Sequence, residues 1–382
     1  MVGVSVWQIG EQNTKKSATL ALFTNEILKN LANGLKWLLW PLSGLYGMAT
    51  AVRNFLYNRK YLTVYESSIY ALSVGNLTVG GTGKTPHIAY LLKKLNNKYQ
   101  LATLSRGYGR QTRGFVAATA QSTAADIGDE PLQLFQHFGQ QVPVLVCEKR
   151  AIGLQIIEKI YPKTQLVLLD DAFQHRAVLP SLSLLLTDYG RLFYEDFLLP
   201  TGRLREARAG AQRAQAVVVS KCPAHLDEAQ QAHIRSLILK YTAAQTPVFF
   251  STFQYGLPQP YFVQQPPWRN DAPCVVVSGI AQPVLFENAA KASFNVQHQM
   301  VFGDHHRFDA TNLGHISSAA AGRVVLTTEK DFVKLKPLLA ANSSNILFYY
   351  WPIEVAFLPT QNLNFDEWLF DKLRVVARLP LA

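Results

Sequence analysis

Short apolar runs recur along most of the chain, separated by stretches whose apolar residues follow the spacing of a helix. Polar residues or glycines bound most of the runs, which is typical of buried strands. The runs that we assign to strands of one sheet are 71–74, 101–105, 142–146, 165–171, 182–187 and 216–219. Because strands alternate with helices, the pattern predicts an α/β fold built on a doubly wound, mainly parallel sheet.

The later part of the chain predicts a second, smaller α/β lobe. Apolar runs at 274–278 and 324–327 predict its strands, and the stretch 365–376 predicts a closing helix. A chain of 382 residues is also long for one typical domain. We therefore expect a first lobe over residues 67–250, and a second lobe with a C-terminal helix over residues 251–382.

The N-terminal part is expected to contain a membrane-associated helix. Residues 1–26 show no clear pattern and are interpreted as a loose extension, whereas positions 37–52 carry no charge and include Trp and Tyr, which are typical of membrane interfaces. This uncharged stretch has 16 residues, fewer than the ~20 that a spanning helix needs. Basic residues flank it, so residues 27–66 predict a helix lying in the interface. The alternative is an ordinary helix packed on the core.

The net charge of +11 favours an anionic partner, which includes nucleotides, phospholipid head groups, phosphorylated substrates and nucleic acid. The sequence has no helix-turn-helix signature, no zinc-finger spacing and no RNA-binding motif, so nucleic acid is not expected. The three cysteines, Cys147, Cys222 and Cys274, are far apart in sequence and predict neither a structural zinc site nor a disulfide framework.

The strongest local signal is a glycine-rich turn between an apolar strand and a helix. Glycines let backbone N–H groups approach phosphate, the helix N-terminus adds positive potential, and a lysine reaches the β and γ phosphates. The residues predicted to bind ATP in this way are Thr78, Val79, Gly80, Gly81, Thr82, Gly83, Lys84 and Thr85. The general phosphate-loop pattern has glycine where Thr78 stands, so this loop is a variant of it.

A second signal is an apolar strand that ends in Asp170 and Asp171. This is the form of a Walker B strand, which delivers an aspartate to the metal ion beside a phosphate loop. The sequence does not distinguish which of the two aspartates binds the ion. Thr85 and Glu130 are further candidate ligands, and ATP and Mg²⁺ are the expected cofactors.

Asp129 is the candidate general base, in the segment Gly-Asp-Glu-Pro at 128–131. Pro131 suits the first position of a helix, so the carboxylates of Asp129 and Glu130 can equally serve the helix N-terminus. A carboxylate held there is a weak base and needs a helper. His305 is a candidate helper, although no spacing shows that it meets Asp129.

Several other polar residues are candidates for contacts with phosphate or sugar. Three arginines and a glutamate crowd the turn at 199–208, where guanidinium groups match phosphate and carboxylate oxygens. The alternative for this turn is a solvated basic loop. Gln174 and His175 follow the Walker B aspartates after two intervening residues, where they either reach the γ-phosphate or sugar or only shape the turn.

Taken together, these motifs resemble the tetraacyldisaccharide 4′-kinase family. The matching segments are 74–86, Ser-Arg-Gly-Tyr-Gly-Arg at 105–110, 128–131, Leu-Asp-Asp-Ala-Phe-Gln-His at 169–175, 199–206, Gly-Asp-His-His at 303–306 and Leu-Thr-Thr-Glu-Lys-Asp at 326–331. No single segment is decisive, but their common order is specific, and threonine at position 78 is normal in this family. Ala172 departs from the glycine common there, and residues 1–26 look additional.

The resemblance implies transfer of the ATP γ-phosphate to the 4′-hydroxyl of a lipid-linked disaccharide 1-phosphate in lipid A synthesis. It implies a peripheral enzyme on the cytoplasmic face of an inner membrane, with a P-loop kinase core and a second lobe. By matching positions, Asp129 resembles the catalytic base and His305 its partner. The residues that the resemblance places around nucleotide and substrate are Tyr108, Gln174, His175, Arg205 and Glu206.

The alternative function is a P-loop switch ATPase or GTPase that needs no lipid acceptor. The membrane-type N-terminal segment disfavours a soluble small-molecule kinase. Neither the acyl chains of the substrate nor the oligomeric state can be inferred from the sequence.

Overall fold

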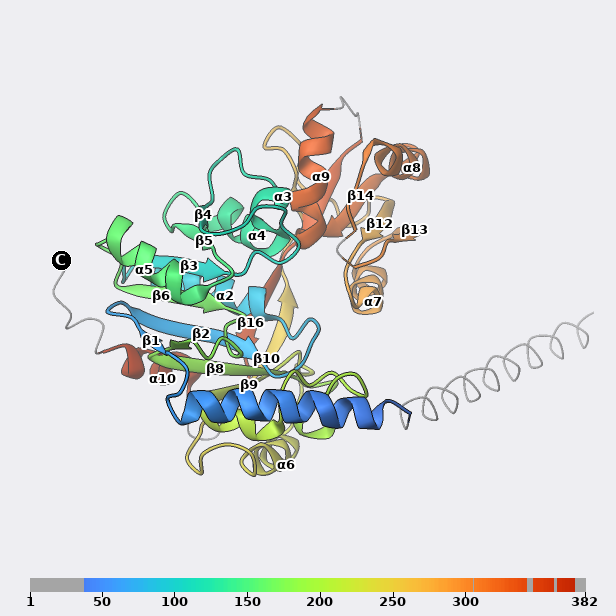
Figure 1. Ribbon diagram of the computed structural model, residues 1–382. Helices are drawn as coiled ribbons and strands as arrows, with labels where there is room; N and C mark the ends of the chain where they lie inside the picture. Colours follow the sequence, from blue (N-terminus) through green and yellow to red (C-terminus); the bar gives the residue numbers. More distant parts are fainter. Residues whose placement is uncertain (1–37, 305, 342–345, 361–362, 375–382) are drawn as a thin grey trace, which may run out of the picture.

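The computed structural model describes residues 38–304, 306–341, 346–360 and 363–374. The extension at 1–26 and His305 lie outside these residues. Figure 1 shows a large lobe built around one twisted sheet, a smaller lobe beside it, and a long N-terminal helix along the large lobe. No helix in the described part of the chain has the length and apolar character to cross a membrane.

The large lobe is built on a mainly parallel sheet, as the alternating pattern predicts. Within the described ranges it has nine strands in the order β16-β10-β9-β8-β2-β6-β3-β5-β4, and only the outermost pairs, β16 with β10 and β4 with β5, are antiparallel. The strands are β2 (Tyr70–Asn76), β3 (Leu101–Ser105), β4 (Val116–Ala117), β5 (Val144–Val146), β6 (Leu166–Asp170), β8 (Leu182–Asp188), β9 (Ala216–Ser220), β10 (Val248–Tyr255) and β16 (Ile353–Phe357). Their continuous apolar runs are buried because helices cover both faces.

Helices on each face seal this sheet with apolar side chains. One face carries α2 (Lys84–Leu95), α4 (Asp129–Phe138) and α10 (Phe365–Leu373). The opposite face carries α5 (Arg150–Ile160) and α6 (Glu228–Ile238). The short helix α3 (Ala124–Ile127) precedes α4, and a small parallel ladder joins β1 (Tyr65–Glu66) to β7 (Val178–Leu179).

The smaller lobe is a second α/β unit, as expected. Its sheet has the order β11-β15-β14-β12-β13. The elements are β11 (Gln259–Pro260), β12 (Cys274–Ser278), α7 (Pro283–Ser293), β13 (Val296–Val301), α8 (Ala310–Ala320), β14 (Val324–Thr328), α9 (Glu329–Ala341) and β15 (Phe348–Trp351). The strands β13, β12, β14 and β15 are parallel, and β11 closes the far edge antiparallel to β15.

The predicted boundary at residue 250 needs a correction, because the chain returns to the large lobe. β10 runs through position 250, and β16 pairs with it from Ser251↔Phe357 to Tyr255↔Ile353. The C-terminal helix α10 then packs on the large sheet, where Phe365 and Leu369 join its core. The smaller lobe is therefore inserted between two adjacent strands, a pairing that local apolar patterns do not reveal.

The anchoring of α10 is testable with one buried leucine. Leu369 is fully buried in the core of the large sheet, so Leu369→Ala should lower the free energy of unfolding by about 2–5 kcal/mol. Leu363 lies just before the helix and is 40% exposed, so Leu363→Ala should change stability by less than about 1 kcal/mol. Denaturant unfolding monitored by circular dichroism checks both. Equal effects would contradict the packing of α10 on the large sheet.

Candidate active site

The glycine-rich segment forms a loop between the end of β2 and the first residue of α2. Gly80 and Gly83 have φ angles of 110° and 81°, in the region that favours glycine. Neighbouring strands hold the loop: the Ser220 hydroxyl donates to the Thr82 carbonyl at 2.8 Å, and the Asn76 side-chain amide donates to the Thr82 hydroxyl at 2.9 Å. The loop therefore has a fixed backbone at a helix N-terminus, the arrangement that binds phosphate.

The Walker B strand lies directly beside this loop. β6 pairs with β2 in parallel, with Asp170 opposite Val74, so both strands deliver their last residues to the same sheet edge. The Asp170 side chain is buried, and its Oδ1 has no hydrogen-bond partner within the described residues. Burial and the nearby charge of Glu130 raise the pKa of Asp170. An unpartnered, buried carboxylate oxygen of this kind fits a bound cation.

Asp171 has a different environment. The Arg205 guanidinium donates to both carboxylate oxygens of Asp171, at 2.7 and 3.1 Å, and the Lys84 ammonium lies 3.7 Å away. Burial alone would raise the pKa of Asp171, but the charges of Lys84 and Arg205 hold it well below its usual range. Asp171 therefore has two cationic partners at short distance, whereas Oδ1 of Asp170 has no hydrogen-bond partner among the described residues.

Asp129 is the first residue of α4 and lies where the two lobes meet. Its carboxylate is 3.9 Å from the Lys334 ammonium, which comes from α9 of the smaller lobe. Gly128 precedes the helix with a φ of 93°. The helix begins two residues before Pro131 rather than at it, but both acidic side chains occupy its first turn, as expected.

His305 lies outside the described residues. Its neighbours belong to the smaller lobe and face α9: the Lys330 ammonium donates to Asp304 at 3.0 Å, and the Lys334 ammonium donates to the His306 carbonyl at 3.2 Å. No local pattern connects Lys334, about thirty residues further along the chain, with this group.

Glu206 and Gln174 organise the turn after the Walker B strand. Glu206 is fully buried and accepts hydrogen bonds from Arg213 at 2.7 Å, from Gln174 at 3.1 Å and from Asn54 of the N-terminal helix at 3.0 Å. Gln174 also donates to the Asn76 carbonyl at 2.8 Å. These contacts tie the N-terminal helix, the Walker B turn and the phosphate loop together. Both residues therefore stabilise the local structure, a role that the sequence alone left open.

His175 and the buried Arg150 lie close to the aspartates. Burial, followed by the charge of Arg150, lowers the pKa of His175 to about 4, which keeps its ring neutral at pH 7. Arg150 is 1% exposed and donates to the Cys147 and Asp170 carbonyls at 2.5 and 3.2 Å. Sequence analysis missed Arg150, because an arginine at the start of an ordinary helix carries no local sign of burial.

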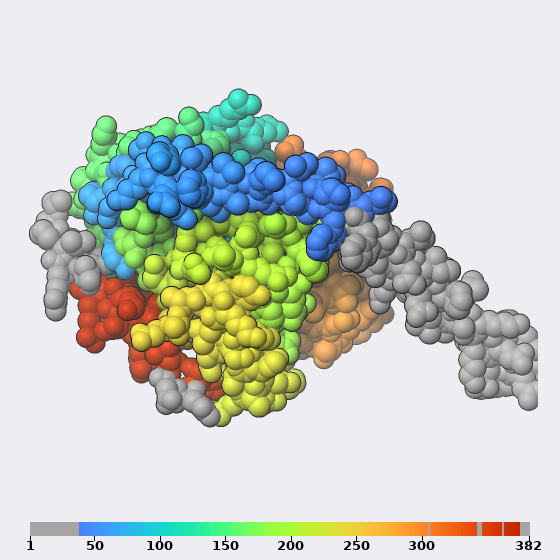
Figure 2. All heavy atoms as spheres, turned by 60° about the horizontal axis from the view of Figure 1, so that its bottom comes forward, coloured from blue at the N-terminus to red at the C-terminus, as the bar shows by residue number. Residues whose placement is uncertain are grey.

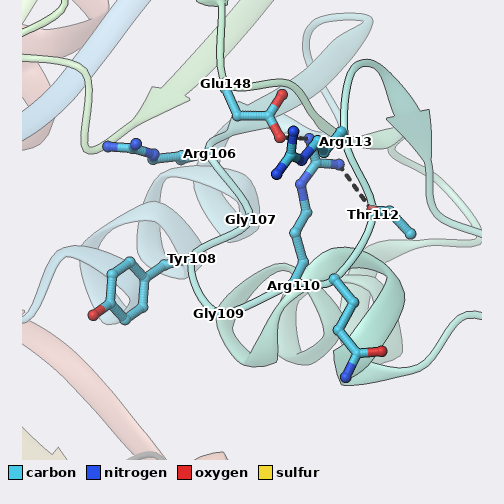
Figure 3. Close-up of a pocket in the computed structure, with 9 residues that line it drawn as sticks. Arg106, Gly107, Tyr108, Gly109, Arg110, Thr112, Arg113 and Glu148 are labelled. Atoms are coloured by element: carbon cyan, nitrogen blue, oxygen red, sulfur yellow. Dashed lines mark hydrogen bonds and ion pairs between the residues drawn. The ribbon is translucent and has the colours of Figure 1, made fainter.

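Tyr108 lies on an exposed loop beside a cavity of about 430 Å³. Figure 3 shows the Arg106 and Tyr108 side chains directed to one side of this loop, while Arg110 reaches toward Glu148. The Arg110 guanidinium pairs with Glu148 at 2.6 Å. Tyr108 is 69% exposed, so its side chain lies at the solvent-facing side of this cavity.

The described residues contain no group of three or more His, Cys, Asp or Glu side chains able to hold a metal by themselves. Mg²⁺ is usually bound by one or two carboxylates together with water and substrate phosphates, and the buried Asp170 carboxylate, whose Oδ1 has no hydrogen-bond partner among the described residues, fits this kind of site.

The loop backbone predicts a clear difference between two of its glycines. At Gly83, with φ of 81°, Gly83→Ala forces alanine into the left-handed region and should lower the free energy of unfolding by at least about 1 kcal/mol. Gly81→Ala is the matched control, because the added Cβ meets nothing within 4 Å and its φ is not in that region. Thermal unfolding without nucleotide measures both; a stable Gly83→Ala variant would contradict the geometry of the loop.

Comparison with known proteins gives one consistent answer. The family model described as tetraacyldisaccharide-1-P 4′-kinase matches residues 35–374. The tetraacyldisaccharide 4′-kinases of Cytophaga hutchinsonii and Flavobacterium johnsoniae are 41% and 42% identical, covering 86% and 87% of this chain and 93% and 96% of their own. The crystal structure of LpxK from Aquifex aeolicus in complex with ATP superposes with a TM-score of 0.70 at 25% identity, covering 90% of this chain and 99% of that one. The chain therefore belongs to the tetraacyldisaccharide-1-phosphate 4′-kinase family.

Proposed function

We propose that this protein transfers the γ-phosphate of ATP to the 4′-hydroxyl of a tetraacyldisaccharide 1-phosphate, the lipid named in the family description. The observation that carries the proposal is the meeting of three elements at one sheet edge. The phosphate loop, the buried carboxylate of Asp170 and the acidic first turn of α4 converge there, since the charge of Glu130 acts on Asp170. The switch ATPase is not favoured, because the family match extends over nearly the whole chain.

ATP would lie with its phosphates on the loop of residues 78–85. The loop amides, the N-terminus of α2 and Lys84 supply positive potential to the β and γ phosphates. Thr85 and Asp170 would hold Mg²⁺, and Glu130, whose charge raises the pKa of Asp170, is a further candidate ligand. When bound, the ion would neutralise phosphate charge. We assign Asp170 rather than Asp171 to this task, because Arg205 already occupies both oxygens of Asp171.

Asp129 is the proposed base for the acceptor hydroxyl. In an in-line transfer, the 4′-hydroxyl oxygen forms a bond to the γ-phosphorus while the bond to the β–γ bridging oxygen breaks, and ADP leaves. The hydroxyl proton passes to the Asp129 carboxylate, and we propose His305 as its partner. Five residues are proposed to surround nucleotide and sugar. They are Arg205, Gln174, His175 and Glu206, which would form the wall behind the phosphates, and Tyr108.

The described part of the N-terminal helix, residues 38–58, turns its polar side inward. Ser43 donates to the Thr201 hydroxyl at 2.7 Å, and Tyr46 donates to the Arg205 carbonyl at 2.8 Å. Figure 2 shows the helix stretched along the surface of the large lobe. The inward contacts therefore join the helix directly to the loop that carries Arg205.

The outward side of this helix is apolar. Its large exposed side chains recur at about one per helical turn and are Leu38, Leu42, Leu45, Met48, Val52 and Phe55, with 51% of Trp40 also exposed. A solvent-facing helix normally shows the opposite arrangement. Arg59 and Lys60 follow the stripe, and cations there suit anionic head groups.

This inverted arrangement supports attachment to a membrane surface. We propose that the stripe lies in the interface of the inner membrane, on its cytoplasmic face, and that the protein is peripheral. The acyl chains of the acceptor then stay in lipid while its sugar reaches the adjoining active site.

The kinase proposal predicts lipid-dependent transfer that requires Asp129. Purified protein in detergent micelles with labelled ATP and Mg²⁺ should phosphorylate added disaccharide 1-phosphate lipid. Asp129→Asn keeps the shape of the side chain but cannot accept the proton, so kcat should fall by about 100-fold or more, with little change in nucleotide binding. ATP hydrolysis that ignores the lipid would overturn the kinase assignment and favour the switch ATPase.

The membrane proposal predicts that charge on the stripe releases the protein. The double variant Leu45→Glu with Met48→Glu places two carboxylates at residues 62% and 64% exposed. Flotation with vesicles containing anionic phospholipid should show vesicle-bound protein reduced by at least about tenfold. The matched control is Leu257→Glu with Val263→Glu, which changes two side chains 75% and 95% exposed in the segment leading into the smaller lobe. Equal loss in both variants would argue against a specific role for the helix.

A further inference from the structure

The two lobes are joined through α4 and α9, which lie side by side in Figure 1. The middle of this contact is apolar, where Leu132 of α4 shares a cluster with Phe332 and Val333 of α9. At one end, His137 of α4 lies 2.5 Å from Glu329 of α9. At the other end, Lys334 of α9 approaches Asp129 of α4. The position of Asp129 relative to the smaller lobe is therefore set by this contact.

Lys334 has a side chain only 6% exposed, which is unusual for lysine unless charges surround it. Its ammonium lies 2.9 Å from the Asp331 carboxylate, donates to the His306 carbonyl at 3.2 Å and lies 3.9 Å from the Asp129 carboxylate. One ammonium group thus contacts the candidate base, the loop that carries His305, and a buried anion of its own helix.

Asp331 provides a rigid support for this lysine. It is fully buried, and its Oδ2 accepts hydrogen bonds from the Gly279 amide and the Thr328 hydroxyl, both at 2.7 Å. Its Oδ1 faces Lys334. Because the backbone just after β12 and the last residue of β14 fix Asp331, the carboxylate that pairs with Lys334 is held in place beside the lobe boundary.

The simpler explanation is that Lys334 only neutralises the buried charge of Asp331. That explanation requires no contact with the large lobe or with the backbone at His306. Both contacts are present, and they come from opposite sides of the lobe boundary.

Resting on the proposed kinase function, we infer that Lys334 is a positioning residue for phosphoryl transfer. It holds the Asp129 carboxylate of the large lobe and the backbone at His306 of the smaller lobe in one fixed arrangement. The base then faces the acceptor hydroxyl only when both lobes are docked. A displacement of about 1 Å at such a site costs up to about 100-fold in rate.

The first test is Lys334→Met, which keeps the length of the side chain and removes its charge. In the lipid-dependent assay, kcat should fall between about 10- and 100-fold while KM for ATP stays within about twofold. Lys334→Arg should recover part of the lost rate. The control is Lys336→Met on the same helix, whose ammonium lies over the Phe332 ring 5.0 Å away and should leave kcat unchanged.

A second variant separates positioning from simple neutralisation. Lys334→Met combined with Asp331→Asn leaves no unpaired buried carboxylate, and the asparagine oxygen still accepts from Gly279 and Thr328. If Lys334 only neutralises Asp331, this double variant regains wild-type kcat, and the inference is wrong. If Lys334 positions Asp129, kcat stays low although thermal unfolding returns to the wild-type temperature.

A double-mutant cycle completes the test. In the Asp129→Asn background, Lys334→Met should cost less than about twofold in kcat, because the group through which it acts is already lost. Additive losses would overturn the inference. Absence of lipid-dependent transfer in the wild-type protein would instead overturn the proposed function, so the two failures are distinguishable.

Discussion

Negative charge collects at the carboxyl ends of β2 and β6, and the arrangement of the site depends on how this charge is balanced. Asp171 is paired with Arg205 and Lys84, whereas one oxygen of Asp170 has no partner in the described residues. ATP bound at the loop would bring further negative charge to the N-terminus of α2. A buried anion is costly unless it is paired, so a cation held by Asp170 would offset this negative charge. The same argument supports the different roles proposed for Asp170 and Asp171.

The connection between the lobes gives the second constraint. The smaller lobe is inserted between β10 and β16, which are neighbours in the large sheet, so it is tied at two adjacent points. The contact of α4 with α9 adds a third link, with an apolar centre and charged ends. A base carried by one lobe and a loop carried by the other are useful together only if these links keep their relative position. The buried Lys334 lies where that requirement is greatest.

In the N-terminal helix, several polar side chains are turned toward the protein and many large apolar side chains are exposed. Ser43 and Tyr46 face the protein, and their hydrogen bonds to the loop at 198–206 hold the helix there. Its large apolar residues are left on the outside. An exposed apolar surface of this kind is typical of sites that bind a partner or a membrane, which supports the proposed membrane contact. The helix also touches Glu206 through Asn54, so the proposed membrane contact and the active-site wall share one element.

Local sequence determined much of this protein: the alternating elements, the phosphate loop, the Walker B aspartates and the acidic first turn of α4 all depend on residues close together in the chain. The existence of a second lobe followed from apolar runs, but its boundary did not, because the return of β16 and α10 to the large sheet depends on pairing across about a hundred residues. Which aspartate is neutralised, which face of the N-terminal helix is outward, and which lysine reaches Asp129 were decided only by the tertiary structure. Charges act through space, and the groups that set them, such as Arg205 beside Asp171 and Lys334 beside Asp129, come from distant segments that no local pattern connects.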